Sequence, residues 1–204
     1  MTELQALRDT YRRDKAALLA LLAASQASTR GIHSHLRTLA QIAGNLLTQL
    51  WQRAALPDSM ALVAVGGFGR DQLFPYSDVD VLLLLPEGCT TDSGCELRAQ
   101  LESFIGSCWD AGLEIGSSVR TVSDCLRESS GDVTVQTSLL EARLLCGNAT
   151  AFADFEQRYG EQIQAQYQQR DAEQVVIDFA VRIPDAAPAS SCGGGGHGCG
   201  CSGG

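Results

Sequence analysis

The residues most suited to chemistry in this sequence are two aspartates, Asp78 and Asp80, that stand one residue apart. The apolar run 79–85 predicts a strand, so both side chains should point to one face, about 6.5–7 Å apart along the backbone. Two carboxylates at this spacing repel each other unless a cation lies between them, and their oxygens suit a hard divalent ion, above all Mg²⁺. Two such ions about 3.5–4 Å apart would bind the attacking and leaving oxygens of an in-line phosphoryl displacement. We therefore predict that Asp78 and Asp80 are catalytic and hold Mg²⁺.

A glycine pair precedes these aspartates: Gly66 and Gly67 are followed by ten residues and then by Asp78. Glycines have no Cβ, so backbone N–H groups there could approach the phosphates of a nucleoside triphosphate. Arg70 could hold a phosphate oxygen in a charge-assisted contact, or pair with a nearby aspartate. Ser77 could contact the γ-phosphate, or only shape the turn. The expected nucleotide-binding residues are thus the two glycines, Arg70 and Ser77.

A third carboxylate is expected as a metal ligand or as the general base for an incoming hydroxyl. Glu114 is the candidate, on the polar side of a predicted strand, with a surface residue or a partner of Arg120 as the alternative. Asp132 is a weaker candidate, because an aspartate at the start of a helix usually caps it. Arg120 and Arg143 are interpreted as structural ion-pair residues.

The elements that must position these residues follow from hydrophobic periodicity and turn residues. Residues 1–57 predict a helical hairpin with no chemistry of its own, and residues 58–160 the domain with the candidate site. The continuously apolar strand 79–85 should be central and covered on both faces. The other elements expected in this domain are a strand over 60–65, a short helix over 70–74, a helix over 95–109, a half-buried strand over 113–122, and helices beginning after Thr121, spanning 138–145 and beginning after Thr150.

The end of the chain differs in composition. Residues 161–183 predict a helical segment, and residues 184–204 a flexible tail rich in Gly and Cys. Cys192, His197, Cys199 and Cys201 could in principle close a zinc site, but the glycines provide no scaffold for one. A flexible end of low complexity is the alternative.

Composition limits the classes of function. The net charge of −9 over 204 residues disfavours binding to DNA, RNA or a membrane surface. The sequence shows no signal peptide and no apolar run long enough to span a bilayer, so a cytoplasmic protein is expected. Five scattered cysteines are interpreted as ordinary thiols of a reducing compartment.

The glycines and aspartates lie in the string GGFGRDQLFPYSDVDVLLLL, which resembles the N-terminal nucleotidyltransferase domain of the bacterial PII uridylyltransferases. Two more blocks, residues 112–121 and 132–145, extend the resemblance over about residues 30–160. Ser117 stands where the family usually has His. The family's Pro-Gly-Gly-Leu-Arg-Asp segment, HD domain and ACT domains have no counterpart in this sequence, so a truncated member is expected.

The resemblance implies a polymerase-β-like nucleotidyltransferase fold, an α/β or α+β arrangement in which a small mixed sheet carries helices on one face after a helical N-terminal extension. It implies transfer of UMP from UTP to a tyrosine hydroxyl of the PII nitrogen-regulatory protein, with Mg²⁺ and release of pyrophosphate. Asp78 and Asp80 match the family's magnesium ligands, and Gly66 and Gly67 its phosphate-binding glycines. The alternatives are a non-catalytic nucleotide-binding or truncated regulatory module, and transfer to a small-molecule acceptor.

Overall fold

The computed structural model describes residues 2–24, 29–89 and 96–181. Contacts divide the chain into two units, Met1–Ile163 and Gln164–Gly204. Cys95 and the four candidate zinc ligands of the tail lie outside the described residues, so those interpretations, like the predicted domain boundaries, stay predictions. The described helices are α1 (Glu3–Ala24), α2 (Thr29–Ala54), α3 (Gly66–Gly69), α4 (Glu96–Asp110), α5 (Val122–Gly131), α6 (Val133–Leu140) and α7 (Ala149–Val181).

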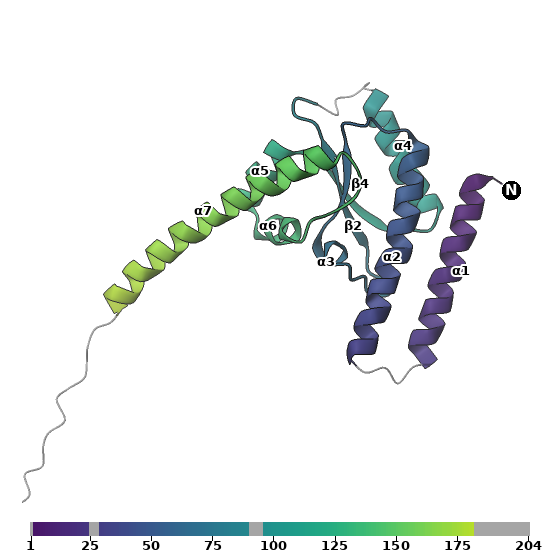
Figure 1. Ribbon diagram of the computed structural model, residues 1–204, viewed down its shortest axis with the longest axis horizontal. Coiled ribbons are helices and arrows are strands. Elements are labelled where there is room, and N and C mark those ends of the chain that lie inside the picture. Colours follow the sequence, from purple (N-terminus) through teal and green to yellow (C-terminus); the bar gives the residue numbers. More distant parts are fainter. Residues whose placement is uncertain (1, 25–28, 90–95, 182–204) are drawn as a thin grey trace, which may run out of the picture. The chain divides into compact units, whose positions relative to one another are not determined.

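The first unit is built on a four-stranded mixed sheet with the order β3-β2-β1-β4 (Figure 1). Its strands are β1 (Ala61–Ala64), β2 (Val79–Leu85), β3 (Ile115–Thr121) and β4 (Arg143–Gly147). β1 pairs antiparallel with both β2 and β4, whereas β2 and β3 run parallel. β2 is an inner strand and is buried along its length except at Asp80, which confirms the prediction for this apolar run.

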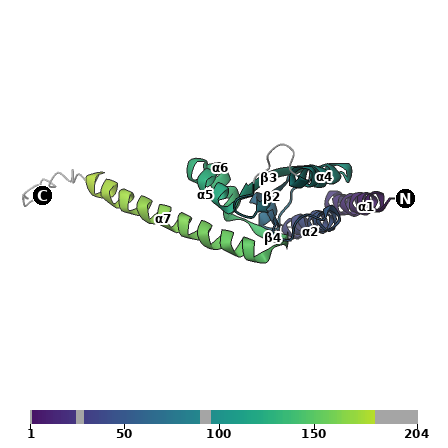
Figure 2. The ribbon, with the colours of Figure 1, turned by 90° about the horizontal axis from the view of Figure 1, so that it is seen from above.

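Helices cover both faces of the sheet, so the expectation of helices on one face is wrong (Figure 2). Alternate residues of β1 and β2 enter separate cores because successive side chains of a strand point to opposite faces. Val81 and Leu83 pack with α1, α2 and α4, whereas Leu82 and Leu84 pack with α5, α6 and the start of α7. A strand that is apolar at every position but one, as β2 is, therefore indicates a sheet with two covered faces.

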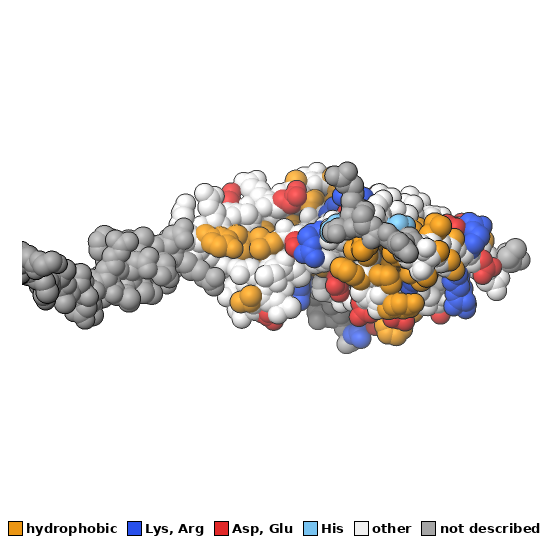
Figure 3. Space-filling view, turned by 90° about the horizontal axis from the view of Figure 1, so that it is seen from below, with side chains coloured by type: hydrophobic (Ala, Val, Ile, Leu, Met, Phe, Trp, Pro, Cys, Tyr) orange, Lys and Arg blue, Asp and Glu red, His pale blue; other side chains and the backbone are white. Residues whose placement is uncertain are grey.

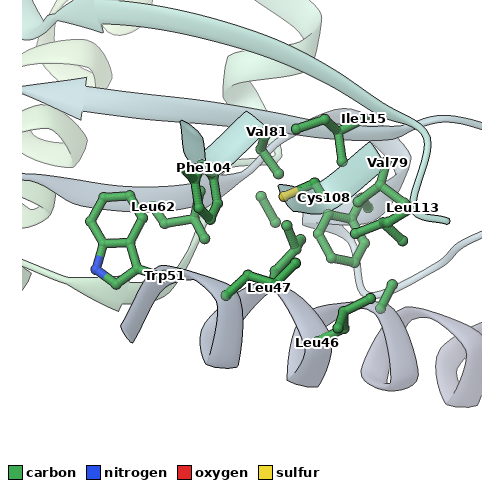
Figure 4. Packing of buried hydrophobic residues seen from close by; sticks show 14 of the residues in the cluster. Leu46, Leu47, Trp51, Leu62, Val79, Val81, Phe104, Cys108, Leu113 and Ile115 are labelled. Carbon is green, nitrogen blue, oxygen red and sulfur yellow. The ribbon is translucent and has the colours of Figure 1, made fainter. Parts of the chain in front are cut away.

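The core on the first face joins the N-terminal helical hairpin to the sheet. α1 and α2 form the predicted hairpin, and Tyr11 and Leu18 of α1 are buried in this core. Figure 4 shows Leu47 and Trp51 of α2 beside Phe104 of α4, and the rings of Trp51 and Phe104 meet edge to face at 5.6 Å. The hairpin is therefore held by a shared core, not only by its connection to β1.

Three local predictions are wrong. Residues 138–145 do not form one helix: α6 ends at Leu140 and β4 begins at Arg143, because this segment pairs with β1 across about eighty residues of sequence. Residues 70–74 form a turn with Asp71 at φ 61°, and the short helix lies before them in α3. The side chain of Asn148, not Thr150, accepts the backbone N–H of Ala151 at the start of α7.

Other local predictions are confirmed. Thr121 and Asp124 form the capping box of α5, and Asp132 caps α6 by accepting the N–H groups of Thr134 and Val135. Within the described part of the chain, no helix has the length and apolar character needed to cross a membrane.

Candidate active site

The candidate site is centred on Asp80, which lies between glycines of the two neighbouring strands. On one side the backbone N–H of Val65 donates to the Asp80 carbonyl at 3.1 Å, which brings Gly66 beside it. On the other side Asp80 is the register partner of Gly116 on β3. An ideal Cβ on Gly66 would lie 3.6 Å from Asp80 Oδ2, and one on Gly116 would lie 2.6 Å from Asp80 Oδ1. The Asp80 carboxylate therefore occupies the space that the two glycines leave open.

The electrostatics of this carboxylate favour a cation. Partial burial, and then the negative charge of Asp78, raise the pKa of Asp80 above its ordinary value. Asp78 precedes β2 by one residue, so the prediction that the two aspartates share one face of the sheet stays a prediction. A cation at this position would stabilise the charged carboxylates and so offset both burial and repulsion. Proteins usually bind Mg²⁺ through one or two carboxylates, and water and phosphate complete its coordination. The donor set thus fits magnesium.

Gly66 and Gly67 form the first residues of α3, directly after β1. Gly66 has φ +58°, a conformation that residues with a Cβ rarely adopt, whereas a Cβ on Gly67 would make only ordinary contacts, the nearest at 3.6 Å. The first turn of a helix has N–H groups without an intrahelical partner. The segment therefore begins with donors at the same end of the sheet as Asp80.

This glycine segment is held against β4 by contacts that the sequence did not reveal. A Cβ on Gly69 would lie 1.7 Å from the carbonyl oxygen of Glu141, so backbone meets backbone there. Arg143 donates from Nε to the Gly69 carbonyl at 3.1 Å and from Nη2 to the Phe68 carbonyl at 3.0 Å. Arg143 Nη2 also lies 3.6 Å from Asp71 Oδ1, which confirms the prediction that Arg143 forms a structural ion pair. The position of the glycine segment thus depends on β4.

Arg70 and Ser77 have partners within the protein. Arg70 pairs with Glu141, and Ser77 donates from Oγ to the Phe74 carbonyl at 3.0 Å, which shapes the turn before β2. Both residues lie in the loop between the glycine segment and the aspartates, yet neither contact is with the aspartates. Their roles in nucleotide binding stay predictions.

Glu114 comes just before β3, where its carbonyl accepts the N–H of Val79 at 2.9 Å. Burial, and then the charge of Glu114, raise the pKa of Tyr11 to about 12, which places the Glu114 carboxylate near that phenol. Glu114 and Asp78 also line one cavity of about 520 Å³. Over residues 2–24, 29–89 and 96–181, no three His, Cys, Asp or Glu side chains are grouped to hold one metal ion. Glu114 is thus placed beside Asp78 without completing a three-carboxylate metal site.

Sequence reasoning did not single out Gly69 and Gly116, and it did not predict that Arg143 contacts the glycine segment, although the geometry depends on all three residues. Gly69 and Gly116 both stand in the motif blocks. A glycine can indicate that another segment approaches the backbone closely, but the sequence does not show which segment that is. Arg143 was expected to form a structural ion pair, and its hydrogen bonds to the glycine segment could not be read from spacing. The partners of all three lie in segments distant in sequence.

Several curated proteins similar to this chain share one name. A bifunctional uridylyltransferase/uridylyl-removing enzyme of Cupriavidus metallidurans is 51% identical over 155 residues, 76% of this chain and 17% of that protein. The enzyme of that name from Ralstonia nicotianae is 58% identical over 121 residues, 59% of this chain and 14% of that protein. One from Burkholderia mallei is 48% identical over 155 residues. This chain is related to the uridylyltransferases over three quarters of its length. It spans no more than 17% of these relatives.

The sequence relationship confirms the predicted resemblance. A uridylyl group is a nucleotidyl group, so the relatives' name also supports nucleotidyl transfer. No family model matches the chain. Two solved toxin–antitoxin structures, one a MntA–HpeT mutant and one with AMP-PNP, each cover 67% of this chain and 97% of their own. Their TM-scores are 0.39 and 0.38 at 13% and 18% identity, a likeness that assigns no function. The mixed α/β sheet with a helical N-terminal extension is confirmed by the fold itself.

Proposed function

We propose that this chain is a nucleotidyltransferase that moves UMP from UTP to a tyrosine hydroxyl of a PII-type signal protein and releases pyrophosphate. The observation that carries the proposal is the Asp80 carboxylate between Gly66 and Gly116, with Asp78 beside it, in a chain 51% identical to a uridylyltransferase. The PII-type acceptor, a role in nitrogen regulation and a cytoplasmic location come from the resemblance of the motif string and belong to the same proposal.

Asp78 and Asp80 would hold Mg²⁺ in this proposal. When bound, the metal supplies charge neutralisation for the triphosphate and for the charge that develops in an in-line displacement. The two carboxylates would contribute a pair of oxygen donors, and Gly116 leaves the room in which the Asp80 carboxylate lies. Partial burial, and then the charge of Asp78, raise the pKa of Asp80, and a bound cation would offset both effects by favouring the charged carboxylate.

The protein's other groups bind and orient the nucleotide. Backbone N–H groups at Gly66 and Gly67 would donate to phosphate oxygens. Arg70, half exposed in its ion pair with Glu141, would turn from that carboxylate to a phosphate oxygen. Ser77, whose hydroxyl now donates to the Phe74 carbonyl, would lie at the γ-phosphate end.

Glu114 would take the proton of the acceptor hydroxyl as general base. The acceptor oxygen then forms a bond to the α-phosphorus while the bond from that phosphorus to the bridging oxygen breaks. Pyrophosphate leaves with the electron pair of that bond, so atoms and charge balance. The acidic net charge of −9 supports a protein or small-molecule acceptor over a nucleic acid.

Incorporation of labelled UMP tests the proposal directly. The full chain is incubated with Mg²⁺, labelled UTP and a PII-type protein, and label in the acceptor and released pyrophosphate are both measured. Asp80→Asn, and removal of Mg²⁺ by a chelator, should each abolish incorporation. The matched control is Asp58→Asn, because Asp58 is exposed and precedes β1 at the end opposite Gly66.

The lack of a third carboxylate grouped with Asp78 and Asp80 among the described residues favours a second candidate, a module that binds nucleotide without turnover. Calorimetry with UTP and Mg²⁺ distinguishes the two. Binding without pyrophosphate release in the presence of acceptor supports the module. Incorporation that persists in Asp80→Asn refutes the assignment of the site.

A further inference from the structure

A second feature of the same sheet end is a cavity of about 520 Å³ at the start of β3. Its size lies within the range of about 300–1,000 Å³ that is typical of small-ligand sites. The described residues that line it are Asp78, Trp109, Gly112, Leu113, Glu114 and Ile115. It thus combines an apolar wall with two carboxylates, and none of these lining residues is basic. Such a lining favours a neutral, partly apolar group that can donate a hydrogen bond, and it disfavours a phosphate.

Trp109 stands out on this wall because 66% of its surface is exposed, whereas Trp51 is 8% exposed and packed against Phe104. Figure 3 shows the molecule from below, turned by 90° from Figure 1. On the face visible there, hydrophobic side chains gather with acidic and basic ones among them. An exposed indole beside a cavity offers a large, rigid surface for another aromatic ring.

The position of the cavity relative to the glycines decides which part of the reaction it serves. Across the sheet the order is the glycine segment after β1, then the aspartates of β2, then the cavity at β3. In an in-line displacement the attacking and leaving oxygens lie on opposite sides of the phosphorus. If the glycine segment holds the leaving pyrophosphate, a hydroxyl that enters from the β3 side would lie opposite the leaving group.

We propose that this cavity is the acceptor subsite and that it takes a phenolic side chain, with Trp109 against the ring and Glu114 next to the hydroxyl. The inference rests on the proposed function and names where its acceptor binds. The phenol oxygen bonds to the α-phosphorus, its proton passes to the Glu114 carboxylate, and pyrophosphate departs toward the glycine segment. Trp109 is a specificity-determining residue in this scheme, and Asp78 connects the subsite to the metal ligands.

Nuclear magnetic resonance of the full chain tests the subsite without requiring turnover. The sequence has two tryptophans, so the spectrum holds two indole N–H signals, which Trp109→Phe assigns. N-acetyl-tyrosinamide, titrated with Mg²⁺ and a non-hydrolysable UTP analogue present, should shift the Trp109 signal and leave that of Trp51 in place. N-acetyl-phenylalaninamide, which lacks the hydroxyl, should bind more weakly. A shift caused by the UTP analogue alone and not by the phenol would place the nucleoside in the cavity and overturn the proposal.

Steady-state kinetics provide the second test. Trp109→Ala should raise the KM for the PII-type acceptor about tenfold and leave the KM for UTP unchanged, and Trp109→Phe should restore most of the loss. Val133→Ala is the matched control, because Val133 on α6 is equally exposed, at 66%, and does not line the cavity. An unchanged acceptor KM in Trp109→Ala contradicts the subsite. If no variant and no wild-type sample releases pyrophosphate, the proposed function fails, while the titration still decides whether the cavity binds a phenol.

Discussion

The two flanks of Asp80 are built in opposite ways. On the β1 flank, Phe68 and Gly69 are buried, and Arg143 and the Glu141 backbone hold the glycine segment against β4. On the β3 flank the strand is only partly covered, and a cavity of about 520 Å³ opens beside Asp78. The first flank offers backbone donors in a fixed position, and the second offers space.

This difference matches the two demands of nucleotidyl transfer. The triphosphate is the same in every turnover, so a rigid cradle positions it at no cost in reorganisation. The acceptor in our proposal is a side chain of another protein that must enter and leave, so its side of the site has to stay open. The contrast predicts that changes on the β1 flank lower stability, whereas changes on the β3 flank lower activity in a folded protein.

Gly69→Ala should have the largest effect on the rigid flank. The added Cβ would meet the Glu141 carbonyl oxygen at 1.7 Å, and backbone must move on both sides to admit it. We expect a loss of about 3 kcal/mol or more in the free energy of unfolding, measured by urea denaturation. Gly106→Ala in α4 is the control, because a Cβ there meets nothing within 4 Å and the substitution should be neutral or slightly stabilising. Equal stability of the two variants would show that the flank is not tightly packed.

Arg143→Met should have the next largest effect on stability. It removes two charge-assisted hydrogen bonds to the Phe68 and Gly69 carbonyls, and the half-exposed guanidinium limits the loss to about 1–2 kcal/mol. The same denaturation series measures it. Arg98→Met removes only an exposed pair with Glu102 and should change stability by less than about 0.5 kcal/mol. If Arg143→Met lowered the free energy of unfolding no more than Arg98→Met does, Arg143 would not be what holds the β1 flank in place.

Gly116→Ala probes the open flank and should separate activity from stability. The new Cβ would lie 2.6 Å from Asp80 Oδ1, and the carboxylate can move where a backbone cannot. We expect stability to change by less than about 1 kcal/mol and UMP transfer to fall about 100-fold, because a carboxylate that we propose to hold the metal is displaced. Thermal unfolding and the transfer assay are measured on the same sample. Full activity of the Gly116→Ala variant would mean that Asp80 need not occupy this place.

Arg70→Gln should have the smallest effect on stability, less than about 1 kcal/mol, because its pair with Glu141 is half exposed. If Arg70 turns to the phosphates, the KM for UTP should rise about tenfold while the KM for the acceptor stays constant. Arg13→Gln, which loses only an exposed contact with Asp14, is the control for removal of one positive charge. A normal KM for UTP would leave Arg70 as a structural partner of Glu141 alone.

Local patterns sufficed for much of the fold. The helical hairpin, the central strand β2, the helix α4 and the capping box of Thr121 follow from periodicity and from residue types within a few positions. Alternation along a strand is also a local property, and from it we predict that Asp78 and Asp80 point to one face. The motif string also sufficed to predict the relationship to uridylyltransferases.

The failures share a non-local cause. Leu144 and Leu145 continue the apolar pattern of α6, and only pairing with β1 makes their segment a strand. The glycine segment forms α3 although Gly is a poor helix former, and its contacts with residues 141–143 lie far from it in sequence. The closeness of Glu114 to Tyr11 depends on how α1 packs on the sheet, and its predicted part in the site stays a prediction.

The sequence by itself determined the chemistry available to this protein: two carboxylates at strand spacing, glycines ten residues before them, and the relatives that share this string. Those features are local because covalent geometry fixes how neighbouring side chains lie. Only the tertiary structure decided that Gly116 makes room for Asp80, that Arg143 holds the glycine segment, and that Trp109 faces a cavity beside Asp78. Each of these joins residues from different elements, and packing between elements is set by the whole core.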